Sequence, residues 1–118
     1  MATRKAATIR LHNPVTPALL SRGVLEVASI ERAGVEYRFD PPLRLKRTRE
    51  HGHIVFENKG LSLFAYGRSD KEALDALSRD FFAVWHGIVE EEDKKLHPSA
   101  RTLKKRMLKA VSGVWEKV

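Results

Sequence analysis

Two pairs of residues have the types and spacings that could support metal or proton chemistry. His51 and His53 lie two apart around a glycine, so both side chains could point the same way, as metal ligands sometimes do. Zinc sites need three or four ligands, and no third ligand lies nearby in the sequence. His86 and Glu90 have the i, i+4 spacing of a surface contact on a helix. We therefore interpret both pairs as ordinary polar residues and expect no metal.

The carboxylates do not form a catalytic pattern either. A metal-dependent nuclease of the ribonuclease H type needs clustered carboxylates on its strands. The expected strands 43–49 and 61–66 carry none, and Glu57 stands alone. The chain also lacks a Gly-rich phosphate loop, a Gly-x-Ser-x-Gly motif and cysteine, which removes thiolate catalysis and disulfides. We predict a non-enzymatic protein without a cofactor.

Basic residues are the feature that favours nucleic acid. The candidate contacts, on one expected strand and one expected helix, are Arg44, Lys46, Arg101, Lys104, Lys105 and Lys109. Phosphate contacts need such charges but carry no sequence preference. Neither segment has the alternating aromatics of a platform for single strands. A run of charge is more often a solvated surface, so both interpretations stay open.

The charge is unevenly distributed along the 118 residues. The total is +7, with +6 over 1–69, −4 over 70–96 and +5 over 97–118. This pattern could suit nucleic acid or an acidic partner, or could serve solubility and internal pairing. No apolar run approaches the ~18 residues that span a bilayer, and the basic start leads into no secretory signal. We expect a cytoplasmic protein with no membrane partner.

Alternation of apolar and polar residues predicts a sheet over 24–66. The expected strands are 24–30, 35–39, 43–49, 53–57 and 61–66. Asp40, Pro41 and Pro42 should end the second strand, because proline donates no backbone hydrogen bond. The last strand is almost wholly apolar, so we expect it to be central and buried on both faces. Residues 1–23 are hard to interpret: 7–12 could form an edge strand, or the segment could be an arm lying on a partner.

A long helix should follow this sheet. Gly67 permits a tight exit, and Ser69 with Glu72 forms a capping box. The helix is predicted over 70–95, with an apolar stripe that consists of Leu74, Leu77, Phe81, Trp85 and Ile88. Acidic residues 90–93 lie at its C-terminal end, which the helix dipole disfavours.

A second helix is predicted over 98–112, with Pro98 at its first position and a basic back. Its apolar face comprises Ala100, Leu103, Met107, Ala110, Val111 and Val114. On the long helix, Phe82 and Val89 widen the apolar arc. Either the second helix or another subunit must cover that arc. We take Phe82 and Val89 as a candidate partner or dimer surface and predict a homodimer.

The predicted fold class is α+β: one domain with an antiparallel β-sheet of about five or six strands packed on one long helix, followed by a shorter C-terminal basic helix. The core at about residues 43–90 resembles the HicB-like antitoxins, on Gly67, Ser69, Glu72, Ala73 and Leu74. This chain departs from the family pattern in two ways. The family usually begins with the matched strands, whereas some forty residues precede them here. Many members also carry a C-terminal DNA-binding module, but the C-terminal segment here is too short for a helix-turn-helix.

The resemblance implies a protein that binds and neutralises a small RNA-cleaving toxin. The predicted function is therefore a non-enzymatic interaction protein with a small, toxin-like protein partner. The alternative is a small basic nucleic-acid-binding protein.

Overall fold

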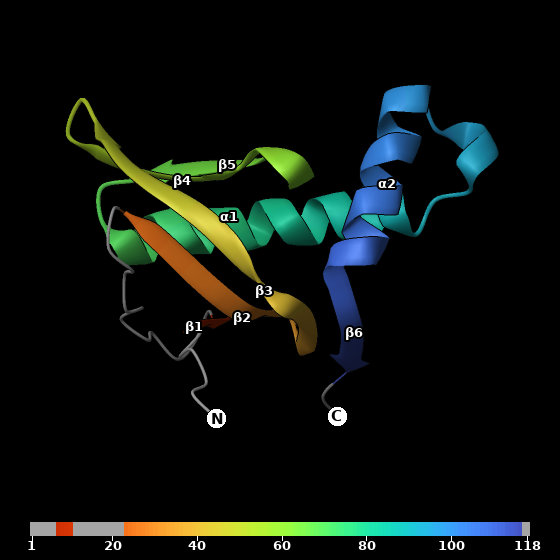
Figure 1. Cartoon of the computed structure of the whole chain (residues 1–118), viewed down its shortest axis with the longest axis horizontal. Coiled ribbons are helices and arrows are strands. Elements are labelled where there is room, and N and C mark those ends of the chain that lie inside the picture. Colours follow the sequence, from red (N-terminus) through yellow and green to blue (C-terminus); the bar gives the residue numbers. More distant parts are fainter. Residues whose placement is uncertain (1–6, 11–22, 117–118) are drawn as a thin grey trace.

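The computed structural model describes residues 7–10 and 23–116, with side chains from residue 23 onward. The described chain forms an α+β fold, as predicted (Figure 1). Its strands are β1 (Ala7–Arg10), β2 (Val24–Arg32), β3 (Val35–Glu50), β4 (His53–Asn58), β5 (Leu63–Gly67) and β6 (Val111–Glu116). Its helices are α1 (Asp70–Val84), continued by a π-helical turn (Trp85–Val89), and α2 (Pro98–Ala110), with short 3₁₀ turns at Lys59–Leu61 and Asp93–Lys95.

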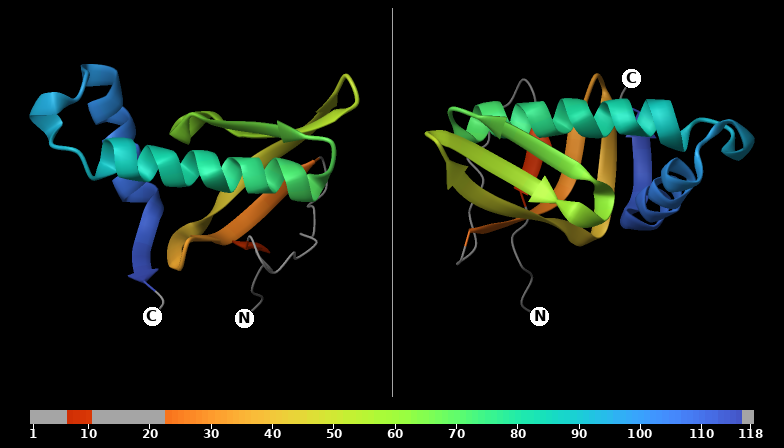
Figure 2. Two further views of the ribbon diagram at one scale, coloured as in Figure 1. Left: turned by 180° about the vertical axis from the view of Figure 1, so that it is seen from behind. Right: turned by 90° about the horizontal axis from the view of Figure 1, so that it is seen from above.

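The strands form one sheet in the order β1-β2-β3-β4-β5, and β6 also pairs with β3. β1 is parallel to β2, and the other pairings are antiparallel. β1 agrees with the short strand predicted within 7–12. The alternative, an arm formed by residues 1–23, falls mostly on residues that the structure does not describe. Helix α1 runs along one face of the sheet (Figure 2), and on the opposite face Phe64 and Tyr66 of β5 are exposed, as are Arg44 and Lys46 of β3.

The last strand of the meander, β5, corrects one prediction. It lies at the edge of the main strand order and not at its centre. Its burial alternates: Leu63 and Ala65 are buried, whereas Phe64 and Tyr66 are exposed. The prediction of burial on both faces is wrong because α1 covers only one face of this strand.

The prolines do not end a strand, contrary to the prediction. β3 continues through Pro41 and Pro42 because these residues lie between its two sets of partners. β6 pairs with residues 35–39 and β4 pairs with residues 46–50. On the β2 side, the register shifts between Val27 and Ser29, so the prolines have no opposite residue there. A missing N–H therefore breaks no ladder bond in the described sheet.

The start of α1 agrees with its sequence signals. Ser69 Oγ accepts a hydrogen bond from the Glu72 N–H at 3.1 Å. Gly67 packs so closely on the helix that a Cβ there would lie 2.6 Å from Ala73 N. The helical segment ends at Val89, six residues before the predicted end at 95. The acidic residues 90–93 follow directly, with Glu90 as the C-cap, so the helix does not extend through residues that its dipole disfavours.

The C-terminal helix also ends early, and the prediction of a helix over 98–112 is wrong at that end. Residues from Val111 onward leave the helix and form β6. Two valines favour a strand, and residues 35–39 of β3 supply an edge for β6 to pair with. Trp115 lies over Arg38, with the guanidinium carbon 3.8 Å from the ring centroid.

The core lies between the sheet and α1, with α2 closing one end (Figure 2). Tyr37 packs on Phe81 and Trp85 with ring centroids 5.1 Å and 5.2 Å away. Met107 of α2 is fully buried in the same cluster. Trp85 is therefore a core residue, as the helical stripe predicted.

Candidate nucleic-acid interface

Two aromatic side chains stand on the open face of the sheet. Phe64 and Tyr66 of β5 are 54% and 61% exposed, and their ring centroids lie 6.4 Å apart. The His53 ring meets Tyr66 edge-on at 5.7 Å. Beside Tyr66 in the same row of the sheet, Val55 of β4 is buried although it lies outside the main core cluster. The edge of the sheet thus presents a paired aromatic surface on an apolar support.

The strand register places basic residues on this same face. Phe64 lies opposite Glu57 of β4, which lies opposite Lys46 of β3. Side chains on one row of an antiparallel sheet share a face, and so do residues two apart on a strand. Arg44, exposed like Lys46, therefore points to the same side. We call this surface the outer face: Phe64, Tyr66, His53, Glu57, Arg44 and Lys46.

A hollow of about 470 Å³ adjoins the basic part of the outer face. Its lining includes Arg44, Lys46 and Lys59, with Glu57 as its one carboxylate among the described residues. Asn58 fixes this corner, because its Nδ2 donates to the Arg44 carbonyl at 2.9 Å and its Oδ1 accepts from Leu61 N at 3.0 Å. The hollow can hold an anionic group such as a phosphate.

The basic residues predicted on α2 do not join the outer face. Lys104 Nζ lies 2.8 Å from Asp93 Oδ1 and donates to the Glu91 carbonyl at 2.7 Å. The hydrogen bond and charge of Lys104 lower the pKa of the Asp93 carboxyl. Arg101 Nε donates to the Leu96 carbonyl at 3.1 Å. These contacts tie α2 to the loop before it.

The remaining two α2 candidates have different surroundings. Lys105 is exposed. Lys109 lines a second hollow, which the backbone of Arg44 helps to form. The structure thus groups Arg44 with Lys46 and separates both from Arg101, Lys104 and Lys105.

The candidate partner surface is largely covered within the chain. Val89 is buried in the core cluster, and Phe82 is half-buried with its ring 4.2 Å from that of His86. Met107 and Val111, from the C-terminal segment, belong to the same cluster, and Leu103 packs against it. The homodimer stays a prediction, and sedimentation equilibrium would test it, with 13.4 kDa as the monomer mass.

The two histidine pairs have local contacts, with His51 exposed and His53 half-buried. His53 Nδ1 lies 3.2 Å from the His51 carbonyl at the hairpin turn, and His86 contacts Glu90 one helical turn away. Among residues 7–10 and 23–116, no group of three or more potential ligands could hold a metal ion. Within the same residues, no helix has the length and apolar character needed to cross a membrane.

The chain matches no family model, no curated protein and no solved structure. The resemblance to HicB-like antitoxins, the toxin-like partner and the absence of enzymatic activity therefore stay predictions.

Phe64, Tyr66 and Lys59 are not among the nucleic-acid contacts that the sequence predicts, and it favours a core role for most of the aromatics. The apolar run that contains both aromatics was interpreted as a buried strand. One available signal was the alternation of large rings with the smaller Leu63 and Ala65. That alternation indicates a strand with two unlike faces.

Proposed function

We propose that this protein binds single-stranded nucleic acid on its outer face. The observation that carries the proposal is the juxtaposition of Phe64 and Tyr66, each more than half exposed, with Arg44 and Lys46 on one side of the sheet. Bases stack on exposed aromatic rings, and each stacked base contributes about 1–3 kcal/mol. Arg44, Lys46 and Lys59 would meet the phosphates.

The strand spacing suits this division of roles. Phe64 and Lys46 lie in one row, two strands apart, so their backbones are separated by roughly 10 Å. A strand crossing the row can place a base on the ring while its backbone reaches the cations. Bases in a duplex are already stacked and paired, so their faces cannot reach Phe64 or Tyr66. Single strands should therefore bind more tightly than duplexes.

Fluorescence anisotropy with labelled oligo(dT), oligo(U) and a duplex of equal length tests this proposal. Phe64→Ala and Tyr66→Ala should each weaken binding of single strands by about fivefold to a hundredfold. Trp115→Ala is the matched control, because Trp115 is an exposed aromatic that pairs opposite Glu36, ten residues along β3 from Lys46. Equal affinity of the Phe64→Ala/Tyr66→Ala double variant and the wild type would overturn the proposal.

A protein partner is the second candidate, favoured by the position of β5 at the edge of the sheet. An extended segment of a partner could pair with such an edge as an added strand. Co-purification of the native protein followed by mass spectrometry tests this candidate. A stoichiometric protein partner whose binding survives nuclease treatment would favour it over nucleic acid.

A further inference from the structure

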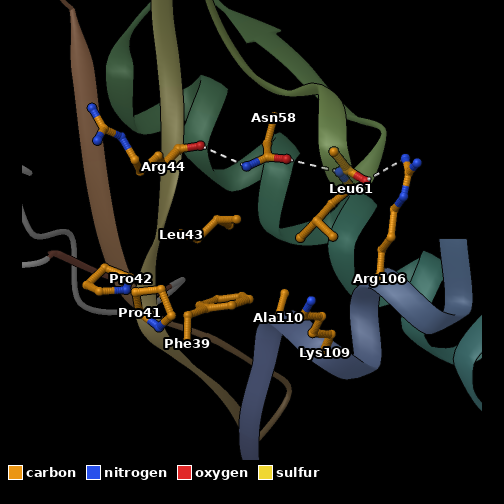
Figure 3. A pocket seen from close by; sticks show the side chains of 11 residues that line it. Phe39, Pro41, Pro42, Leu43, Arg44, Asn58, Leu61, Arg106, Lys109 and Ala110 are labelled. Atoms are coloured by element: carbon orange, nitrogen blue, oxygen red, sulfur yellow. Dashed lines mark hydrogen bonds between the residues drawn. The ribbon is translucent and has the colours of Figure 1, made fainter.

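A second hollow lies between the bend of β3, the 59–61 turn and α2 (Figure 3). Asn58, which hydrogen-bonds to the Arg44 carbonyl and to Leu61 N, lines both hollows. Its volume is about 470 Å³, within the usual range of small-molecule sites. Its walls are mainly apolar, with Phe39, Pro42, Leu43, Leu61 and Ala110 among them. Such walls favour the body of an apolar ligand through burial of its surface.

Two cations stand on the α2 side of this hollow. The Lys109 amino end points toward its interior, and the Arg106 guanidinium lies beside the 59–61 turn, where Nη1 is 3.4 Å from the Gly60 carbonyl (Figure 3). That distance is long for a hydrogen bond, so this contact holds the guanidinium weakly. Among the described residues that line the hollow, none carries a carboxylate. The charge of the site is therefore positive.

The other polar groups of the wall are already engaged. Asn58 uses its amide on the Arg44 carbonyl and on Leu61 N. The Arg44 side chain points away from the hollow and leaves its backbone in the wall (Figure 3). Arg106 and Lys109 therefore determine the charge of the ligand that can bind, and the apolar walls determine its shape.

We infer that this hollow binds a small amphipathic anion: a medium-length aliphatic or aromatic body with one carboxylate. The apolar body lies against Phe39, Leu43 and Leu61, and the carboxylate meets Arg106 and Lys109. A neutral analogue leaves both cations without a charged partner, and a cationic analogue is repelled by them. The inference does not rest on nucleic-acid binding, because the outer face and this hollow use different side chains.

Octanoate, 1-octanol and octyltrimethylammonium are suitable probes, because they share a chain and differ in head-group charge. In titrations followed by NMR of the methyl groups of Leu43, Leu61 and Ala110, octanoate should bind at least tenfold more tightly than octanol. The cation should not shift these signals. Arg106→Gln and Lys109→Gln should each weaken octanoate about tenfold and leave octanol unchanged.

Lys105→Gln is the matched control, since Lys105 is an exposed cation of the same helix outside the lining. Ala110→Leu fills the hollow and should weaken octanoate and octanol alike; thermal melts verify that each variant folds. The inference is overturned if octanoate binds no better than octanol, or if the Arg106→Gln/Lys109→Gln double variant keeps full affinity. Adenosine monophosphate that displaces octanoate and binds more tightly would also overturn it, in favour of a nucleotide.

Discussion

The guanidinium of Arg47 donates two hydrogen bonds to the carboxylate of Asp70. Nε lies 2.7 Å from Oδ1 and Nη2 lies 3.4 Å from Oδ2. Arg47 is on the inner side of β3, and Asp70 is in the first turn of α1, where negative charge is favourable. The pair therefore links the C-terminal part of the longest strand to the start of the helix that covers the sheet.

Asp70→Asn should lower the free energy of unfolding by about 1–2 kcal/mol, because it removes a charge-assisted pair at a helix N-terminus. Urea denaturation at neutral pH measures the change. The control is Arg79→Gln, which breaks the exposed 3.6 Å contact with Asp75 and should cost less than about 0.5 kcal/mol. Equal effects of the two variants would contradict a structural role for the Arg47–Asp70 pair.

Trp85→Ala should destabilise the protein by about 3–5 kcal/mol, as the deletion of a large core aromatic does. The Trp85 ring stacks on Phe81 at 6.2 Å and contacts Tyr37. A thermal melt compared with that of Trp115→Ala, at an exposed tryptophan, separates core loss from the mere loss of a tryptophan. An unchanged melting temperature for Trp85→Ala would contradict the packing.

Alkaline pH should destabilise the fold through Tyr37. Burial, with the nearby charges of Glu90 and Glu116, raises the pKa of Tyr37 to about 12. Because the folded pKa exceeds the unfolded value of about 10, the contribution is complete below pH 10 and is lost as pH rises toward 12. The full loss is about 2–3 kcal/mol. Denaturation midpoints from pH 9 to 12 should fall less in Tyr37→Phe; parallel curves would contradict this assignment.

Nucleic-acid affinity should depend on salt through the outer face. Arg44→Ala and Lys46→Ala should each flatten the plot of log affinity against log salt by about 0.7, the value per phosphate contact on a single strand. Lys105→Ala should leave the slope unchanged, because Lys105 lies on α2. A flatter slope for Lys105→Ala alone would move the contact from the sheet to the helix.

Gly113 is a specific test of the C-terminal strand. A Cβ at this position would overlap the Trp115 ring, so Gly113→Ala should push the ring off Arg38. The fluorescence emission of Trp115, measured in a Trp85→Phe background, should then shift to longer wavelength. An unchanged spectrum would show that Trp115 does not lie over Gly113.

Local signals in the sequence predicted the parts of this fold that local interactions decide. The Ser69 cap, the Ala33–Gly34 and His51–Gly52 turns and the helical stripe through Trp85 depend on residues a few positions apart. The continuation of β3 through Pro41 and Pro42 depends on which neighbours its edges have. The strand over 111–116, whose first two residues the sequence places in a helix, depends on an open edge more than seventy residues earlier.

The candidate site was only partly predictable for the same reason. Arg44 and Lys46 stand out as exposed cations on an alternating strand, and that placement was correct. Their proximity to Phe64 and Tyr66 follows from the order of neighbouring strands, but the apolar run over 61–66 predicts burial of both aromatics, because it does not indicate that a helix covers only one face. The basic pattern of the second helix predicts Lys104 as a phosphate contact, but the structure pairs it with Asp93 of the preceding loop, a contact that helical spacing does not indicate.

The late pairing of β6 has a consequence for how the chain folds. Residues 35–39 gain their second neighbour only when residues 111–116 return across a loop of roughly seventy to eighty residues. Closing so long a loop is slow relative to forming the adjacent β2–β3 and β3–β4 hairpins. Until it closes, one edge of residues 35–39 remains an open template for another chain. Aggregation during synthesis or refolding should therefore begin at this segment and stop once the C-terminal strand docks.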